Sequence, residues 1–527
     1  MSGAPRGARE IPTIARPARL ALPALLGLTA ANFLYQLGSS SYFVDEVQSV
    51  AAAASPLRGV LHAVSATELT PPAYFYFLHE WLLRLSSHAE WVARLPSALC
   101  GVLLVAAVYW LTRLLTERRP VALLAAALSA CSPFVLEYAQ RAQGYVFVML
   151  AVTVAVAAAM EAERAERRRA LWLAGAILAC VLSLWLHYTS AFPVVALCAW
   201  VATRGSFTAR ARTMYLSACA IAGLALVPLL IAQHDSFPHR SGVAASAGVS
   251  GANVATLVAT PFDGRLDALR LLGGLLTVGA VLVLIVLRRG VARERCLLLA
   301  LAAGEPLALL ALSALGGHLM LTRYAAVAAP FMIVAIAVAG DALVRISRPA
   351  AVGRRSPWLR RAGEGPGSSW LQRAVAAAGS LWLRRAVAAA LGTGAVVLAV
   401  AGPLDSHRPS GFYPDARGVV GYIAARERPG DVLLTTRNPA TAVPLIYYGA
   451  ARLHLNWIGD AGTGRLVQTR RRRLWTILEL PPGAPSARRV IALASPGAAS
   501  LGYRVLGERA FPGITPLAVV LAAPIAR

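Results

Sequence analysis

The chain has 527 residues, of which 57% are hydrophobic and 14% are charged, and its formal net charge is +26. A soluble protein carries about 25% charged residues, so these totals exclude an ordinary soluble enzyme. Apolar blocks near the roughly 20 residues that cross a bilayer as a helix recur along the chain and predict an α-helical, multi-pass membrane protein. Every basic residue is arginine. Because the arginines lie in short segments between apolar blocks, they indicate membrane topology rather than nucleic-acid binding.

The N-terminal residues 1–19 form a basic tail, which we expect in the cytoplasm. The apolar run that follows is too long for the h-region of a typical signal peptide, so it predicts an uncleaved first span. The transmembrane domain is predicted over 20–402, with about eleven spans. Their approximate limits are 20–38, 91–112, 120–136, 143–160, 170–186, 189–203, 213–232, 269–287, 296–315, 322–344 and 386–402.

The connecting segments differ in arginine content, and the positive-inside rule places the arginine-rich set in the cytoplasm. The first outer loop is then 39–90. Within it, the short apolar segment 71–85 opens with Pro-Pro and carries charged residues. Counting this segment as a span would place the later arginine clusters outside the cell. The segment therefore predicts an interfacial helix on the outer leaflet. The arginine-rich segments are 112–120, 161–169, 203–213, 288–295 and 345–385.

The C-terminal residues 403–527 are less apolar and predict a small extracytoplasmic α/β domain. The segment 415–436 predicts a helix, a Pro-Gly turn and a strand, and 441–449 predicts a second helix. The segments RRLWTILEL, RVIALAS and LAVVLAAP predict strands. High alanine content and the absence of lysine suggest a GC-rich bacterial genome, so the predicted location is the bacterial cytoplasmic membrane.

Polar and ionisable side chains gather at the predicted outer ends of the spans. Such groups are costly at membrane depth and face a cavity or a partner, so they predict a site at the outer interface. A carboxylate there can accept a proton from a hydroxyl, and arginine can bind a phosphate. The candidates are Asp45, Glu46, Glu68, Tyr138, Arg141, Tyr145, His187, Tyr188, His318, Arg323 and Tyr324.

Several further features limit the chemistry. The chain has no P-loop and no G-x-G-x-x-G segment between a strand and a helix, which favours a lipid-borne donor over a nucleotide. The cysteines lie in apolar segments without C-x-x-C spacing, so they predict no metal site and no disulfide framework. Asp45 and Glu46 with a histidine leave a divalent ion open, but no obligatory cofactor is predicted. Glu305 lies in mid-span, at a depth that does not fit the outer site.

A set of motifs occurs in one order: DE, TPPAYFYFLHEW, WVARLPSALCGVL, SPFVLEYAQRAQGY, LWLHYTSAF and LTRYAAVAAPF. In this order they resemble bacterial glycosyltransferases of the GT-C superfamily. They are most similar to the family 39 type, relatives of dolichyl-phosphate-mannose protein mannosyltransferases and lipid A aminoarabinose transferases. The resemblance covers roughly residues 20–345 and extends more weakly to DARGVVGYIAARERPGDVLL.

This resemblance implies a GT-C fold and inverting transfer of a sugar from a polyprenyl phosphate to an extracytoplasmic hydroxyl on a cell-wall glycan, a glycolipid or a protein. It implies that Asp45 is the general base, that Glu46 supports it or binds the acceptor, and that Arg323 contacts phosphate. Where many relatives read Y-S-Q-E-A-R-x-Y, this chain has YAQRAQGY, so Arg141 replaces a glutamate and Gln143 an arginine. Glu68-Leu69-Thr70 stands where many relatives have Asp-x-His.

Two other functions stay open. A flippase or transporter of lipid-linked sugars would need polar residues along a path through the bilayer. A non-catalytic scaffold of the cell envelope would tolerate the altered YAQRAQGY motif. The expected partners are the lipid-linked donor, the acceptor and membrane lipids, without nucleic acid.

Overall fold

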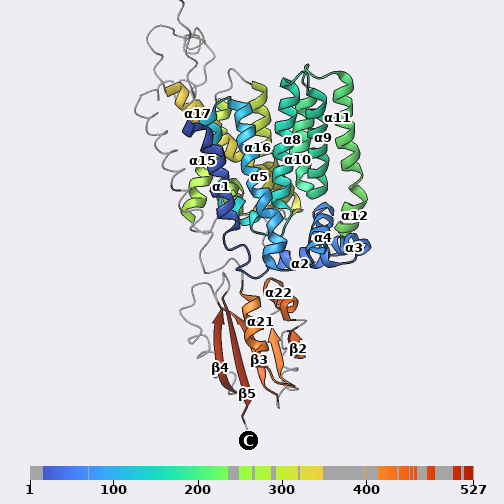
Figure 1. The fold of residues 1–527 in the computed structure, drawn as a ribbon, viewed down its shortest axis with the longest axis vertical. Coiled ribbons are helices and arrows are strands. Elements are labelled where there is room, and N and C mark those ends of the chain that lie inside the picture. Colours follow the sequence, from blue (N-terminus) through green and yellow to red (C-terminus); the bar gives the residue numbers. More distant parts are fainter. Residues whose placement is uncertain are drawn as a thin grey trace, which may run out of the picture.

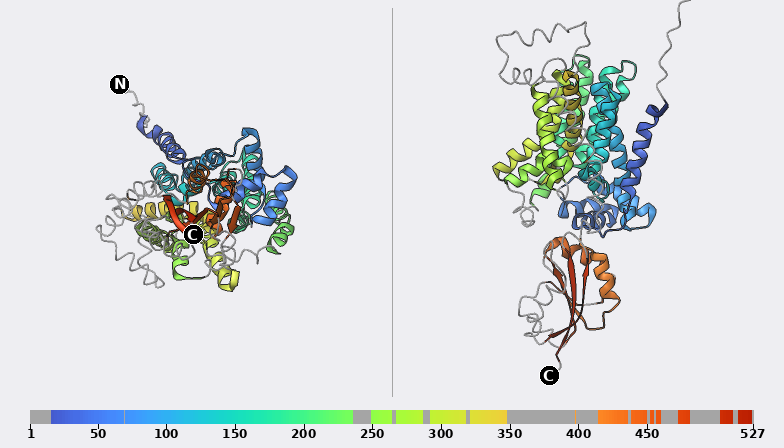
Figure 2. Two further views of the ribbon diagram at one scale, coloured as in Figure 1. Left: turned by 90° about the horizontal axis from the view of Figure 1, so that it is seen from below. Right: turned by 90° about the vertical axis from the view of Figure 1, so that its left-hand side faces the viewer.

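The computed structural model describes residues 16–68, 70–235, 249–263, 267–286, 292–317, 321–347, 397, 414–435, 438–449, 452–454, 456–459, 472–480, 503–511 and 516–525. A bundle of helices forms one body, and a small α/β domain lies at one end of it (Figure 1). Figure 2 shows the same arrangement from two further directions. The predicted fold class, a polytopic helical protein with a C-terminal α/β domain, is confirmed.

Every span predicted before residue 345 corresponds to an apolar helix or helix pair. Among the described residues, 7 helices are long and apolar enough to cross a membrane. They are built from α5 (Glu90–Thr116), α8 (Tyr145–Arg164), α9 (Arg169–Leu186), α11 with α12 (Ala209–Leu224 and Val227–Asp235), α15 (Asp267–Val286), α16 (Ala292–Leu312), and the 3-10 segment η5 with α17 (Thr322–Ala328 and Ala329–Ser347).

The remaining predicted spans are bent or short. Helices α6 (Arg119–Ala130) and α7 (Pro133–Ala139) meet at an angle of 60°. Pro133 lacks an N–H and starts a new helix, whose N-cap Ser132 accepts a hydrogen bond from the Val135 N–H. Helix α1 (Arg16–Leu34) and the pair of η1 (Tyr188–Ser190) and α10 (Ala191–Ala202) are shorter apolar elements. The predicted span 386–402, apart from residue 397, and the predicted strand RVIALAS lie outside the described residues.

Three short helices lie at the end of the bundle that faces the α/β domain (Figure 1). They are α2 (Val44–Ala54), α3 (Leu57–Thr67) and α4 (Ala73–Leu85). With 13 residues, α4 is too short to span a bilayer, as the interpretation of 71–85 as an interfacial helix requires. Leu61 on α3 and Phe77 and Leu83 on α4 are exposed, which suits contact with lipid.

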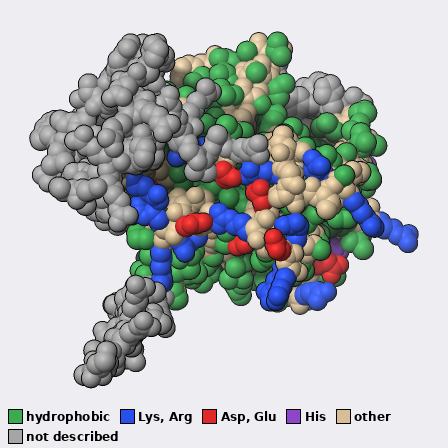
Figure 3. Space-filling model, turned by 90° about the horizontal axis from the view of Figure 1, so that it is seen from above, with side chains coloured by type: hydrophobic (Ala, Val, Ile, Leu, Met, Phe, Trp, Pro, Cys, Tyr) green, Lys and Arg blue, Asp and Glu red, His purple; other side chains and the backbone are tan. Residues whose placement is uncertain are grey.

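The opposite end of the bundle collects arginine side chains (Figure 3). Arg118 and Arg345 both pair with Asp341, and Arg204 pairs with Glu163 and with Glu294. The arginine-rich connections that the structure describes therefore lie at the end remote from the α/β domain.

The α/β domain contains a mixed sheet with the strand order β2-β1-β3-β5-β4 among its described residues. The sheet is parallel between β1, β2 and β3 and antiparallel where β5 meets β3 and β4. Helices α21 (Ala416–Ala424) and α22 (Pro439–Gly449) match the two predicted helices, and Gly430 makes the predicted turn with a φ of +88°. The strands are β1 (Val432–Thr435), β2 (Asn456–Gly459), β3 (Leu474–Glu479), β4 (Tyr503–Phe511) and β5 (Leu517–Pro524).

The predicted strands RRLWTILEL and LAVVLAAP are confirmed as β3 and β5. Trp475 on β3 is fully buried against the sheet and α21, and its indole N–H donates to Asp431 at 2.9 Å. The sheet therefore has a core of its own, separate from that of the bundle.

Close packing of α5 against α1 and α7 depends on Gly101. A Cβ atom at this position would lie 2.8 Å from the Cβ of Ala139 and 2.8 Å from the buried ring of Phe33. We expect Gly101→Ala to destabilise the bundle by about 1–3 kcal/mol through overpacking, measured as a lower thermal midpoint in detergent. Gly175→Ala on α9 is the matched control, since a Cβ there meets nothing within 4 Å. Equal midpoints for the two variants would contradict this packing.

Candidate active site

Glu46, at the start of α2, is fully buried and holds the first outer loop against the bundle. Its Oε1 accepts from Arg94 Nε at 2.8 Å and from the Ala142 N–H at 2.9 Å. Its Oε2 accepts from Arg94 Nη2 at 2.9 Å and from the Phe43 N–H at 3.0 Å. The sequence placed Glu46 among the catalytic residues, but with 0% of its surface exposed and both oxygens engaged, its geometry suits support of the loop.

Arg94 extends this support along the backbone of the loop. Its Nη1 donates to the carbonyl oxygens of Leu37 and Ser40, both at 3.0 Å, and its Nη2 donates to that of Ser41 at 3.0 Å. Sequence reasoning gave Arg94 no role. The available signal was its position near the start of an apolar span, where a charge is costly unless it has a partner.

Burial raises the pKa of Glu46, but Arg94 and the N–H groups of Phe43 and Ala142 lower it by more, so the pKa lies below its ordinary value of 4.5. Glu46 is therefore ionised at neutral pH, and the pair is a buried ion pair with its hydrogen bonds satisfied.

Asp45, the preceding residue, points to the other side of the loop. Its Oδ2 accepts from Arg323 Nη1 at 2.6 Å, although the two residues are 278 positions apart. Their side chains are 23% and 25% exposed, respectively. Adjacent carboxylates thus have different environments, and Asp45 is the one that solvent or a substrate can reach.

Aromatic side chains form a continuous wall that ends at Arg323. The ring centroids of Tyr138 and Tyr145 are 4.8 Å apart, those of Tyr145 and His187 are 5.2 Å apart, and those of His187 and Tyr324 are 6.4 Å apart. The guanidinium of Arg323 lies 5.6 Å from the ring centroid of Tyr324. Residues predicted from three distant motifs are therefore brought together.

His187 is a buried, neutral member of this wall. Burial, followed by the charge of Arg323, lowers the pKa of His187 to about 4. Its Nδ1 lies 2.9 Å from the Thr189 hydroxyl oxygen and 3.3 Å from the Thr189 backbone nitrogen. Among the described residues, Nε2 has no hydrogen-bond partner.

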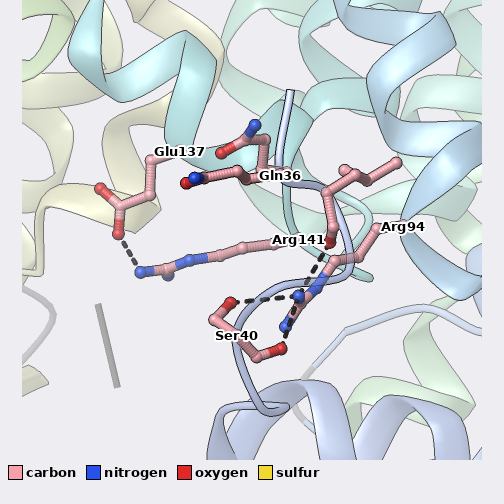
Figure 4. Close-up of a pocket in the computed structure, with 7 residues that line it drawn as sticks. Gln36, Ser40, Arg94, Glu137 and Arg141 are labelled. Carbon is pink, nitrogen blue, oxygen red and sulfur yellow. Dashed lines mark hydrogen bonds and ion pairs between the residues drawn. The ribbon is translucent and has the colours of Figure 1, made fainter. Parts of the chain in front are cut away.

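Arg141 lies beside a small polar pocket next to this wall (Figure 4). It forms an ion pair with Glu137 one helical turn earlier, and its guanidinium lies 5.1 Å from the ring centroid of Tyr138 and 5.7 Å from that of Phe43. Arg141 stands where many relatives have a glutamate, and its positive charge is balanced here by Glu137. The pocket is lined by Gln36, Leu37, Ser40, Arg94, Glu137, Gln140 and Arg141.

The other predicted residues lie elsewhere or outside the described chain. The hydroxyl of Tyr188 donates to Gln233 at 2.7 Å, and Gln233 donates to the Thr70 carbonyl at 3.1 Å, so Tyr188 faces α12 and the segment before α4. Glu68 is half-buried at the C-terminus of α3. His318 lies outside the described residues.

Glu305, which the sequence placed too deep for the site, nevertheless supports it. Its Oε2 accepts from the Ala328 N–H at 2.7 Å, where η5 joins α17. Since η5 carries Arg323 and Tyr324, this buried carboxyl group helps to fix the segment that faces Asp45.

Known proteins are similar to this chain in part of the sequence and in fold. The sequence model of the family described as dolichyl-phosphate-mannose-protein mannosyltransferase matches residues 70–231. The crystal structure of ArnT from Cupriavidus metallidurans in the apo state covers 96% of this chain and 98% of its own, with a TM-score of 0.54 at 14% identity. The same protein bound to undecaprenyl phosphate gives a TM-score of 0.53 at 14% identity, covering 95% of this chain and 97% of that one.

An oligosaccharyltransferase of Archaeoglobus fulgidus, tethered with an acceptor peptide, is also similar in fold. Its TM-score is 0.52 at 11% identity, over 88% of this chain and 69% of that one. No curated protein sequence matches the chain. The resemblance to the GT-C superfamily that the motifs indicated is confirmed, and the bundle has the GT-C fold.

Breaking the buried pair by Glu46→Gln should destabilise the protein by about 3–5 kcal/mol at pH 7, because Arg94 would keep its charge without a charged partner. The folded-state pKa of Glu46 is depressed, so its contribution is present above the ordinary glutamate pKa and is lost as pH falls through the folded-state pKa. Unfolding midpoints between pH 7 and pH 3 should therefore fall less in Glu46→Gln than in the wild type.

Glu80→Gln is the control, since Glu80 is an exposed carboxylate 3.7 Å from Arg84 on α4 and such pairs contribute about 0–1 kcal/mol. If the two variants had the same stability and the same pH dependence, the buried pair would not be the support inferred here.

Proposed function

We propose that this protein is a membrane glycosyltransferase that moves a sugar from a polyprenyl phosphate to a hydroxyl group of an acceptor. The observation that carries the proposal is the partly exposed pair of Asp45 and Arg323. It combines a carboxylate able to take a proton with a cation able to bind a phosphate, beside a wall of aromatic rings at the end of an apolar bundle.

In the proposed reaction, Asp45 accepts the proton of the acceptor hydroxyl as the oxygen attacks the anomeric carbon of the sugar. The new bond forms on the face opposite the phosphate, so the configuration inverts. The bond between the anomeric carbon and the phosphate oxygen breaks, and the polyprenyl phosphate leaves with one additional negative charge. Arg323 stabilises that charge more in the transition state than in the ground state, which is the condition for accelerating the reaction.

The ion pair describes the site before a donor is present. A donor phosphate would compete with Asp45 for Arg323, and its binding would release the carboxylate to the acceptor. Arg141, already balanced by Glu137, is the second cation near the site. Tyr145 and Nε2 of His187 are proposed to contact sugar or phosphate oxygens.

The related structures support the choice of donor. ArnT has been determined bound to undecaprenyl phosphate, and the family model is described by a dolichyl-phosphate-linked mannose donor. Both are isoprenoid phosphates, which we propose for this chain. The proposed acceptor is a hydroxyl on a cell-wall glycan, a glycolipid or a protein.

The distribution of charge supports a site on the outer side of the membrane, and we propose the bacterial plasma membrane as the location. The arginine-rich end of the bundle lies opposite α2 and the α/β domain (Figures 1 and 3), and we propose that this arginine-rich end is cytoplasmic. The candidate site residues gather at the other end, which favours an enzyme over a transporter, because a transporter needs polar groups along a path through the membrane.

Two variants separate the proposed roles. Asp45→Asn should lower kcat by about 100- to 10,000-fold, the range of general-base catalysis, while polyprenyl phosphate binds more tightly because Arg323 has lost its internal partner. Arg323→Gln should instead weaken polyprenyl phosphate binding by about tenfold or more, since a charge-assisted hydrogen bond is lost. The measurements are transfer from a panel of radiolabelled polyprenyl-phosphate sugars and direct binding of polyprenyl phosphate.

Arg84→Gln and Glu80→Gln are the controls, because both side chains are exposed on α4 at the same end of the bundle. Transfer that survives Asp45→Asn would reject this base. An inactive wild type with every donor, in membranes that contain the native acceptors, would reject the enzyme.

A further inference from the structure

The α/β domain contacts the loop that carries Asp45 directly. Arg417, in the first turn of α21, donates from Nη1 to Glu90 Oε1 at 3.0 Å and from Nη2 to the Ser39 carbonyl at 3.0 Å. Glu90 is the first residue of α5 and is 8% exposed. A carboxylate buried to this extent needs a partner, and the α/β domain supplies it.

Two further contacts fix the backbone of the loop. Ser41 Oγ donates to Asp415 at 3.2 Å and accepts from the Arg417 N–H at 3.0 Å. The hydroxyl of Tyr448 on α22 accepts from the Tyr42 N–H at 2.8 Å and donates to Glu90 Oε1 at 2.8 Å. The domain thus satisfies both a side chain and a backbone N–H of the loop.

Packed side chains connect these contacts to Asp45, the candidate base. The ring of Tyr42 stacks on Tyr448 with centroids 6.3 Å apart and meets Tyr447 edge-on at 5.8 Å. The guanidinium of Arg94 lies 5.4 Å from the centroid of the same ring. Arg94 holds Glu46, and Asp45 is the adjacent residue. Between Ser39 and Phe43 the chain has no helix or strand. The conformation of this segment therefore depends on these side-chain hydrogen bonds rather than on the regular backbone hydrogen bonds of a helix or sheet.

We propose that three residues of the α/β domain, Asp415, Arg417 and Tyr448, hold residues 38–46 in place and thereby position Asp45. We call these three residues the latch. Arg417 and Tyr448 are then positioning residues for the transfer, although they do not touch the substrate. The catalytic part of this inference rests on the proposed function, whereas the structural part does not. Misplacing a reacting group by about 1 Å can cost about 100-fold in rate, so fixing the loop matters for catalysis.

The test uses the full-length protein in nanodiscs with four variants: Tyr448→Phe, Arg417→Met, Arg417→Lys and the control Arg426→Met. Tyr448→Phe keeps the ring and removes the hydroxyl that accepts from the Tyr42 N–H. Arg426 lies just beyond α21 and donates to the Tyr422 carbonyl within the α/β domain at 3.3 Å, so its replacement removes the same charge from the same domain. Hydrogen–deuterium exchange of residues 38–46 is measured alongside kcat and KM for the donor.

The latch predicts that Tyr448→Phe and Arg417→Met raise exchange in residues 38–46 by about five- to tenfold, the equivalent of one hydrogen bond. It also predicts that kcat falls by about tenfold or more while the donor KM does not rise, because Asp45 is displaced and Arg323 keeps its contact with the phosphate. Arg426→Met should match the wild type, and Arg417→Lys should recover part of the kcat lost in Arg417→Met.

Unchanged exchange in both latch variants overturns the proposal, whatever the activity. Faster exchange with an unchanged kcat also overturns it, because the loop would then be held without positioning the base. If the wild type transfers no sugar, the proposed function fails while exchange still decides whether the latch exists.

Discussion

The candidate active site depends on the buried ion pair between Glu46 and Arg94. Removing two charges from water is costly, and here the cost is offset by their mutual bonds and by backbone groups from Leu37 to Ala142. The pair fixes an irregular loop against the first long span. Because Asp45 and Glu46 are neighbours in the first turn of a helix, fixing Glu46 inward leaves Asp45 on the side that faces Arg323.

The rest of the site is assembled where helices end or break. Tyr138 comes from the bent pair of α6 and α7, His187 from the end of α9, and Arg323 from a 3-10 segment before α17. Such points expose polar groups that regular membrane helices keep internal. Arg323 and Arg141, the two candidate phosphate contacts, pair with Asp45 and Glu137, so a donor phosphate would exchange with these carboxylates.

The sequence predicted the 7 long apolar helices of the described residues, because their length and apolarity follow from the thickness of the bilayer. It also predicted the residues of the aromatic wall, which lie in short ordered motifs. It left Glu46 open between supporting Asp45 and binding the acceptor, because the orientation of Glu46 depends on Arg94, 48 positions away. The sequence did not predict strand β4, because apolar and polar residues alternate poorly along it and a register shift interrupts its pairing between Val505 and Gly507. The contact of Arg417 with Glu90 joins residues 327 positions apart, and no local pattern records it.

An experimental structure of the full-length protein with bound polyprenyl phosphate would test the central claim most directly. We expect the phosphate to contact Arg323 in place of Asp45, Asp45 to be free to meet an acceptor hydroxyl, and Glu46 to remain paired with Arg94. A phosphate bound away from Arg323, with the Asp45–Arg323 bond unchanged, would contradict it.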